Sequence, residues 1–291
     1  MKKPQIITIV VAAVAVVLLL AFGRTTPRPG AKQASGEAVQ EQAAGDHDHA
    51  NEAGSFSIDT ILALSKKELP ADQVLRLDLL EQSITRGDVK KQQLDVYHQL
   101  AHFWRDTAKA FIPYAWYTAE SARLENSEKS LNFAAQIFLN QLPQVENEQT
   151  RHWMAEQAKD LFEKTLSVNP ANDSAQVGLG ATFLYGGLGT PMEGIGKIRA
   201  VVEKDSTNVY AQMTLATASL MSGQKQKAQE RLETVLRLQP QNIQATLMLG
   251  DLYEKDGNKD QAVQWYSKAL KLVQRADIKA ELEKRIDALK K

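Results

Sequence analysis

The chain contains no cysteine among its 291 residues. Disulfides, thiolate metal sites, iron–sulfur clusters, thiol nucleophiles and a lipid-modified cysteine are therefore excluded. An excess of charge of either sign is also missing, since 35 Lys and Arg balance 35 Asp and Glu. A general nucleic-acid binder needs a basic face, so we expect no nucleic-acid partner. The sequence shows no GxSxG, P-loop, dinucleotide or Asp-rich calcium motif, and we expect neither an enzyme nor a cofactor.

One long apolar run stands near the N-terminus. Residues 6–22 read IITIVVAAVAVVLLLAF without a charge, with Lys2 and Lys3 before them and Arg24 after. As a helix this run is roughly 25 Å long, near the short end of what spans a bilayer. The sequence therefore predicts one transmembrane helix over residues 6–23.

A cleaved signal peptide is the alternative, because Ala21 and Gly23 are small residues at positions that a signal peptidase inspects. The run is longer than the apolar part of most signal peptides, which favours an uncleaved signal anchor. The flanking charges are nearly symmetric and decide little about orientation. By default we expect residues 1–5 in the cytoplasm and a single-pass protein of a bacterial inner membrane, with its C-terminal domain on the periplasmic side.

Residues 24–55 contain almost no large apolar side chain and predict a flexible linker. Within them, residues 46–49 read DHDH, a set of carboxylates and imidazoles that could bind Zn, Ni or Cu weakly. Such a tract on a flexible chain lacks the preorganised geometry of a metal site. A solvated linker is the favoured interpretation, and we predict no metal site.

From residue 57 onward, apolar side chains recur every three or four residues, which predicts helices and no sheet. The sequence also matches itself at a shift of 34 residues. This shift aligns Leu215 with Leu249, Gly223 with Gly257, Ala228 with Ala262 and Leu236 with Leu270.

These positions carry a family resemblance. The last repeat has Leu249, Gly250, Tyr253, Gly257, Ala262, Tyr266, Ala269 and Leu270, and the repeat before it closes with Pro240. The pattern resembles the tetratricopeptide repeat (TPR) family, most closely over residues 174–273, less over 88–173 and least before that. Thr246 departs from it, since the family prefers Trp there. The layout, with an apolar run first, is similar to that of membrane-anchored bacterial TPR proteins.

The resemblance implies an all-α fold, and we expect small residues such as Gly250 where two antiparallel helices approach closely. We expect an α-solenoid of stacked antiparallel helix pairs, with about eleven helices in a right-handed superhelix over residues 57–291. Divergent helices are expected at 56–87, TPR-like repeats at 88–273 and a capping helix at 274–291. The last segment has apolar residues on one side and charges on the other, as the end of a solenoid requires.

In TPR proteins the first helices of the pairs line a concave groove that takes peptides. The resemblance places eleven residues in this groove: Val177, Ala181, Tyr185, Tyr210, Met213, Thr217, Leu220, Met221, Leu247, Asp251 and Glu254. The set is apolar and rich in Met, which favours a partner with apolar side chains. The Lys and Asn set with which chaperone-binding TPR domains hold a C-terminal carboxylate is missing. The leading hypothesis is a membrane-tethered scaffold or adaptor, in envelope assembly or secretion.

Two other hypotheses stay open. His98 and His102 stand four residues apart on a predicted helix, but Gln99 occupies the place of the glutamate of a metalloprotease motif. A metal-handling or enzymatic protein would use this pair or the DHDH tract. The third hypothesis is a self-associating spacer. The glycine-rich segment 185–197 is interpreted either as a long turn or as a lip beside the groove.

Overall fold

The computed structural model describes residues 57–86 and 89–291, and the DHDH tract and the expected anchor and linker lie outside these residues. The described part is helical and contains no strand. Its helices are α2 (Ile58–Lys67), α3 (Ala71–Arg86), α4 (Lys90–His102), α5 (Phe111–Glu125), α6 (Glu128–Gln141), α7 (Glu148–Val168), α8 (Asp173–Gly186), α9 (Pro191–Lys204), α10 (Val209–Met221), α11 (Lys225–Leu238), α12 (Ile243–Lys255), α13 (Lys259–Leu272) and α14 (Ala276–Leu289). A π-helical segment, η1 (Phe103–Thr107), follows α4, and a short 3-10 segment, η2 (Leu142–Gln144), follows α6. In the described ranges, no helix combines the length and the apolarity needed to cross a membrane.

The expected all-helical fold is confirmed for these residues, but the expected number of helices is wrong. Thirteen α-helices occupy the described ranges, against about eleven expected. The segment before residue 88 resembles the repeat least, so its helices could not be counted from the repeat period. It forms α2 and α3, which are separated at Pro70.

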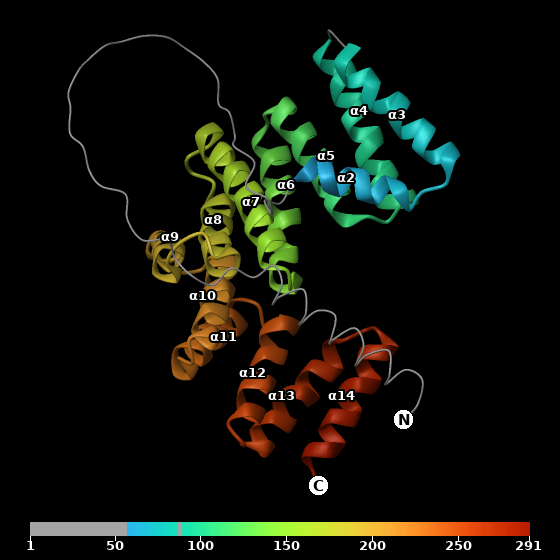
Figure 1. Cartoon of the computed structure of the whole chain (residues 1–291). Helices are drawn as coiled ribbons and strands as arrows, with labels where there is room; N and C mark the ends of the chain where they lie inside the picture. The colour runs from blue at the N-terminus through green and yellow to red at the C-terminus, as the bar shows by residue number, and fades with distance from the viewer. Residues whose placement is uncertain (1–56, 87–88) are drawn as a thin grey trace, which may run out of the picture. The chain divides into compact units, whose positions relative to one another are not determined.

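The helices pack as consecutive pairs. Contacts are most extensive between α6 and α7, α8 and α9, α10 and α11, and α12 and α13, and those between α7 and α8 and between α4 and α5 are nearly as extensive. α14 packs on α13. Figure 1 shows the members of these pairs side by side. Each pair also contacts the next one along the chain, which is the arrangement of a repeat solenoid.

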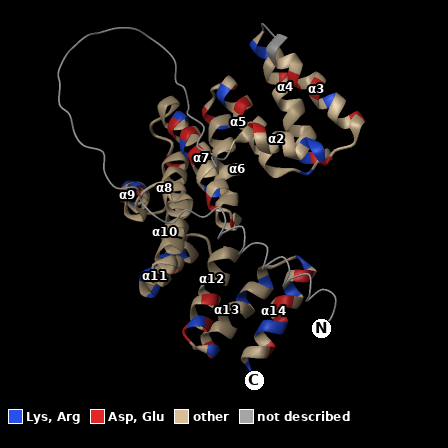
Figure 2. Cartoon of the chain, in the orientation of Figure 1, with Lys and Arg blue, Asp and Glu red and all other residues tan. Residues whose placement is uncertain are grey.

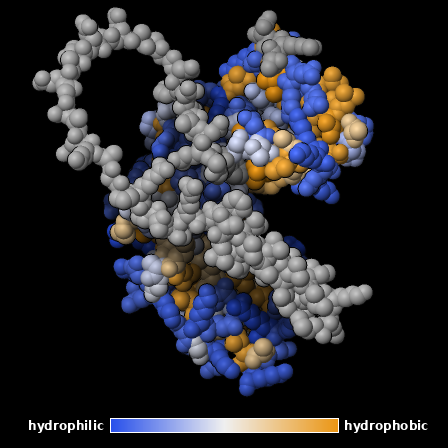
Figure 3. All heavy atoms as spheres, in the orientation of Figure 1, coloured by the Kyte–Doolittle hydropathy of each residue, from blue (hydrophilic) through white to orange (hydrophobic). Residues whose placement is uncertain are grey.

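The first described helices expose part of their apolar side chains. Leu64 of α2 and Leu75 and Leu79 of α3 are each more than half exposed. Figure 3 shows apolar residues at the surface over this part of the chain. Among the described residues, α2 and α3 begin the stack and pack on helices that follow them, α2 on α5 and α3 on α4.

Asparagine side chains begin the first helices of three successive pairs. The side-chain oxygens of Asn172, Asn208 and Asn242 accept hydrogen bonds from the backbone N–H groups three residues on, at 2.8, 2.9 and 2.9 Å. Each cap provides an acceptor for a backbone N–H group that has no partner within the helix, and it stabilises the helix by about 1 kcal/mol. The repeat boundaries are thus fixed locally by the sequence.

Glycines allow the helices of a pair to approach closely. A Cβ atom on Gly180 would lie 2.6 Å from the carbonyl oxygen of Gly194, and one on Gly250 would lie 2.4 Å from the Tyr266 ring. Both separations are too short for real contacts, so only glycine fits there. The sequence had placed Gly250 at such a point of close approach, and this prediction is confirmed.

The glycine-rich segment 185–197 is mostly helical. Only residues 187–190 lie between α8 and α9, because Gly186 ends the one helix and Pro191 begins the other. Gly187 adopts φ +69°, a left-handed conformation that glycine adopts without strain. The segment is therefore a short turn between paired helices and not a long lip.

Charged side chains tie neighbouring pairs together. Arg123 of α5 donates to Asp160 of α7 at 2.9 Å and to Glu120 at 2.8 Å, and Lys164 also pairs with Asp160. Burial raises the pKa of Asp160, but the hydrogen bonds from Lys164 and Arg123 outweigh it, and the pKa lies below its usual 3.8. This cluster fixes α5 against α7.

Candidate protein-binding surface

The first helices of three successive pairs lie next to one another. α6 contacts α8, and α8 contacts α10. Across them, the side-chain amide of Gln136 on α6 donates a hydrogen bond to the hydroxyl oxygen of Tyr210 on α10, at 3.3 Å. Side chains on this side of α6, α8 and α10 therefore share one surface.

Large apolar side chains remain exposed on this surface. Phe133 on α6 is 57 % exposed, Tyr210 is 36 % exposed and Met221 on α10 is 61 % exposed. Tyr210, Thr217 and Met221 are spaced by seven and four residues, which places them on one face of α10. We name the following set the first-helix surface: His98, His102, Phe133, Gln136, Tyr185, Tyr210, Thr217, Leu220 and Met221.

Tyr185 joins α8 to this surface. Burial raises its pKa, while a hydrogen bond with Thr217 acts in the opposite direction and Tyr210 adds to the increase. Burial likewise raises the pKa of Tyr210. Both phenol groups therefore stay protonated near neutral pH, and the surface offers uncharged hydroxyl groups among apolar side chains.

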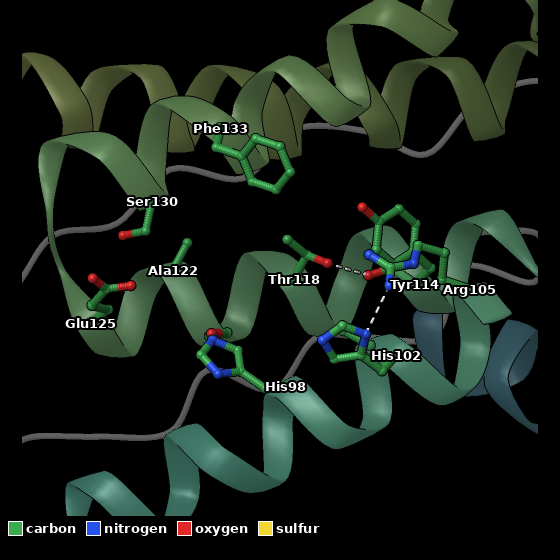
Figure 4. A pocket seen from close by; sticks show the side chains of 11 residues that line it. His98, His102, Arg105, Tyr114, Thr118, Ala122, Glu125, Ser130 and Phe133 are labelled. Atoms are coloured by element: carbon green, nitrogen blue, oxygen red, sulfur yellow. Dashed lines mark hydrogen bonds between the residues drawn. The ribbon is translucent and has the colours of Figure 1, made fainter.

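A hollow of about 170 Å³ extends the surface toward α4. Figure 4 shows His98 and His102 of α4 on one side of it and Phe133 of α6 on the other. Tyr114 and Thr118 of α5 form part of its floor. Aromatic rings and imidazoles surround this hollow, so it suits an apolar or aromatic side chain of a partner.

Arg105 holds the histidine at the rim. Its guanidinium donates to Nδ1 of His102 at 2.8 Å and pairs with Asp106 at 2.7 Å. The hydrogen bond from Arg105 is the main cause that lowers the pKa of Asp106 to about 2. The described residues contain no group of three or more potential metal ligands. The pair His98 and His102 is thus placed at a rim and not in a ligand cluster.

Three of the residues expected in the groove are buried. Val177 is fully buried and packs with α9 and α10 side chains, Ala181 is 2 % exposed, and Met213 is 9 % exposed. For the two α8 residues, the reason is the close approach of α8 to α7 and α9, which glycines permit. Met213 of α10 is buried in the cluster that α10 forms with α11 and α12. These three side chains belong to the core and line no open groove.

Asp251 and Glu254 also have another role than expected. The Tyr266 hydroxyl lies 2.6 Å from Asp251 and 2.7 Å from Glu254, and Arg285 of α14 pairs with Asp251 at 3.0 Å and with Glu254 at 2.7 Å. The Arg285 guanidinium also lies 4.6 Å from the centre of the Tyr266 ring. We name these four residues the cap network. Both carboxylates connect α12 to α13 and α14, and Arg285 compensates part of their charge within the fold.

Leu247 and Leu220 are half-buried. Leu247 packs against the cluster that joins α13 and α14, and Leu220 packs against the cluster of α10, α11 and α12. Tyr185, Tyr210, Thr217 and Met221 lie on the first-helix surface. Their contact with a ligand stays a prediction.

Phe133, Gln136 and Arg105 were not predicted from the sequence. These residues lie in the part of the chain where the resemblance was weaker, so no repeat register assigned them to the groove. One signal in the sequence could have identified Phe133: it follows the polar Asn132 and is additional to the apolar stripe of its helix. Only the packing of α4, α5 and α6 shows that the Phe133 ring stays outside the core.

Comparisons with known proteins support the repeat family. Residues 213–279 match the family model named Tetratricopeptide repeat. No curated protein sequence matches the chain.

Three solved structures illustrate partial similarity. MamA from Desulfovibrio magneticus RS-1 is 21 % identical, with 64 % of this chain and 96 % of that chain covered and a TM-score of 0.43. The pilF protein of Pseudomonas aeruginosa is 17 % identical, with 69 % and 85 % covered and a TM-score of 0.46. The TPR protein TTC0263 of Thermus thermophilus is 15 % identical, with 69 % and 98 % covered and a TM-score of 0.48. The family match covers α11, α12 and α13 in full and overlaps the residues where the sequence repeats at a shift of 34.

Proposed function

We propose that the chain is a scaffold that binds a protein segment through apolar side chains, across the first-helix surface. One observation carries this proposal: Phe133, Tyr210 and Met221 expose apolar area on α6 and α10, although both helices also contribute side chains to buried apolar clusters. Exposed apolar groups that gather on one surface mark interaction sites more often than scattered ones do. A scaffold needs no catalytic group, in line with the absence of catalytic motifs from the sequence.

The geometry supports an extended or helical peptide as the bound segment. Apolar contacts along α6 and α10 alternate with hydrogen-bonding groups of Gln136, Tyr185 and Thr217, which can pair with a peptide backbone. Met221 is unbranched and adapts to side chains of different shape. The hollow beside Phe133 would hold one larger anchor side chain.

The membrane tether belongs to the same proposal. Residues 6–23 would hold the scaffold at a bacterial inner membrane, with the helical domain on the periplasmic side. The support is the uncharged run of residues 6–22 with basic flanks. Removal of residues 1–23 should release the protein from membranes that are washed with alkaline carbonate. An N-terminus found at Arg24 on the mature protein would instead show a cleaved signal peptide.

Site-specific photocrosslinking of the full chain tests the binding surface. A photoreactive amino acid at Phe133 or Met221 should crosslink a protein in intact membranes. A matched one at Val168, which is 44 % exposed at the end of the second helix α7, should not. The variant Phe133→Glu should reduce the crosslink from Met221, because a charge in the hollow opposes an apolar anchor. The same crosslinks from all three positions would show a non-specific surface and refute the proposal.

A further inference from the structure

Three cationic side chains surround a second hollow, on another part of the chain. Arg199 of α9 and Lys227 and Arg231 of α11 line a space of about 120 Å³. No carboxylate lines it, while Ser222 and Gln224 contribute polar groups. Figure 2 shows Lys and Arg on both α9 and α11. Like charges that converge without a counter-charge repel one another, so this arrangement costs stability unless an anion is bound.

The three cations differ from others that lie between helices. Among the described residues, none of the three forms an ion pair with a carboxylate, and Lys227 and Arg231 donate instead to uncharged glutamine oxygens at 2.7 and 2.8 Å. Arg123 and Arg285 also lie between helices, and each of them pairs with two carboxylates. Burial lowers the pKa of Arg231, Arg199 lowers it further, and Glu230 acts in the opposite direction. The fold therefore neutralises comparable guanidinium groups elsewhere, but not here.

The floor of this hollow is apolar. Leu215 and Ala218 of α10 are buried beneath it, Ile195 of α9 is half-buried, and Met192 is 65 % exposed beside it. Met adapts its shape to a bound apolar group. A free inorganic anion would leave this floor uncovered. A ligand that carries both a carboxylate and an apolar side chain would use the whole site.

We propose that this hollow binds the carboxylate side chain of an acidic protein segment, with a neighbouring apolar side chain of that segment on the floor. Arginine guanidinium groups suit carboxylates because both are planar and can form paired hydrogen bonds. We name the three cations and this floor the basic hollow.

The basic hollow is distinct from the first-helix surface. Both use α10, but at 100° per residue Leu215 and Ser219 lie on the face opposite to Tyr210 and Thr217. One partner can thus occupy the first-helix surface while an acidic segment occupies the basic hollow. The protein would then hold two segments at once. A test that finds no binding at one of the two sites would leave the proposal for the other site unaffected.

Calorimetric titration of the full chain in detergent tests the proposal. The probe is a capped six-residue peptide of alternating Glu and Leu, and its control has Gln in place of Glu. The variant Arg199→Gln/Lys227→Gln removes the two exposed cations. The matched control Lys255→Gln/Lys284→Gln removes the same charge from exposed positions outside the hollow.

We expect the Glu peptide to bind the wild type and the control variant equally. Binding to the Arg199→Gln/Lys227→Gln variant, and binding of the Gln peptide to the wild type, should each be roughly tenfold weaker, as for loss of charge-assisted hydrogen bonds. The melting temperature of this variant should not fall, since the two side chains hold no ion pair. An equal loss in the control variant would show non-specific charge attraction. Inorganic phosphate that binds as tightly as the peptide would show a free-anion site. Either result, or no binding of the Glu peptide, would overturn the proposal.

Discussion

The cap network predicts how the last helix is held on the solenoid. Replacement Arg285→Met keeps the aliphatic part of the side chain and removes its charge. The variant loses the contacts of Arg285 with Asp251 at 3.0 Å and Glu254 at 2.7 Å, and its position over the Tyr266 ring. The two carboxylates then retain the Tyr266 hydroxyl as their only common partner within the network.

The size of the effect follows from the exposure of these groups. The Arg285 side chain is 41 % exposed, and its two partners are 41 % and 30 % exposed, so solvent screens both ion pairs. Each pair is therefore worth roughly 0.5 kcal/mol, and the cation over the ring adds about 0.5–1 kcal/mol. We expect α14 to be destabilised by about 1.5 kcal/mol.

Hydrogen exchange of the full chain measures this locally. In a solenoid, a terminal helix contacts only the adjacent repeat and can open without the rest. Amides of α14 should therefore exchange about tenfold faster in the variant, since about 1.4 kcal/mol corresponds to a factor of ten. Arg275→Met is the matched control, because Arg275 pairs only with Asp277 at the start of the same helix, where they are 72 % and 64 % exposed. If both variants exchange alike, or if the protection of α14 is unchanged, the carboxylates are not structural and the reasoning is wrong.

Three further predictions concern packing and pH. The variant Gly250→Ala should destabilise the fold by about 1–3 kcal/mol in urea unfolding, since its Cβ atom would overlap a buried ring; a neutral result would refute the close approach. By contrast, Gly196→Ala should stabilise it by roughly 0.5–1 kcal/mol, because this helical position is open; a loss of stability would contradict the described packing. The lowered pKa of Asp160 predicts stability that is present above about pH 4 and lost as the pH falls through the folded-state pKa. In urea unfolding between pH 5 and 2, the free energy of unfolding should fall less steeply with decreasing pH in Arg123→Gln than in the wild type. An unchanged dependence on pH would rule out the Arg123–Asp160 pair as a cause.

The sequence by itself determined the class of fold and the repeat. Helical periodicity acts within one helix, and the 34-residue shift compares the sequence with itself, so both can be recognised without tertiary structure. Gly250 as a point of close approach followed from the same register. The number of helices before residue 88 could not be predicted in this way, because the repeat pattern is weakest there.

Only the tertiary structure decided which side chains of the expected groove are free. Val177 and Tyr185 both stand on α8 in an apolar stretch, yet one is buried between helices and the other is half-exposed. Their difference depends on how closely α7, α9 and α10 approach. Asp251 looked like a groove residue because its partner Arg285 lies on another helix, 34 residues further along the chain. The unpaired charges of the basic hollow are likewise a property of three packed helices, since each cation alone resembles any surface residue.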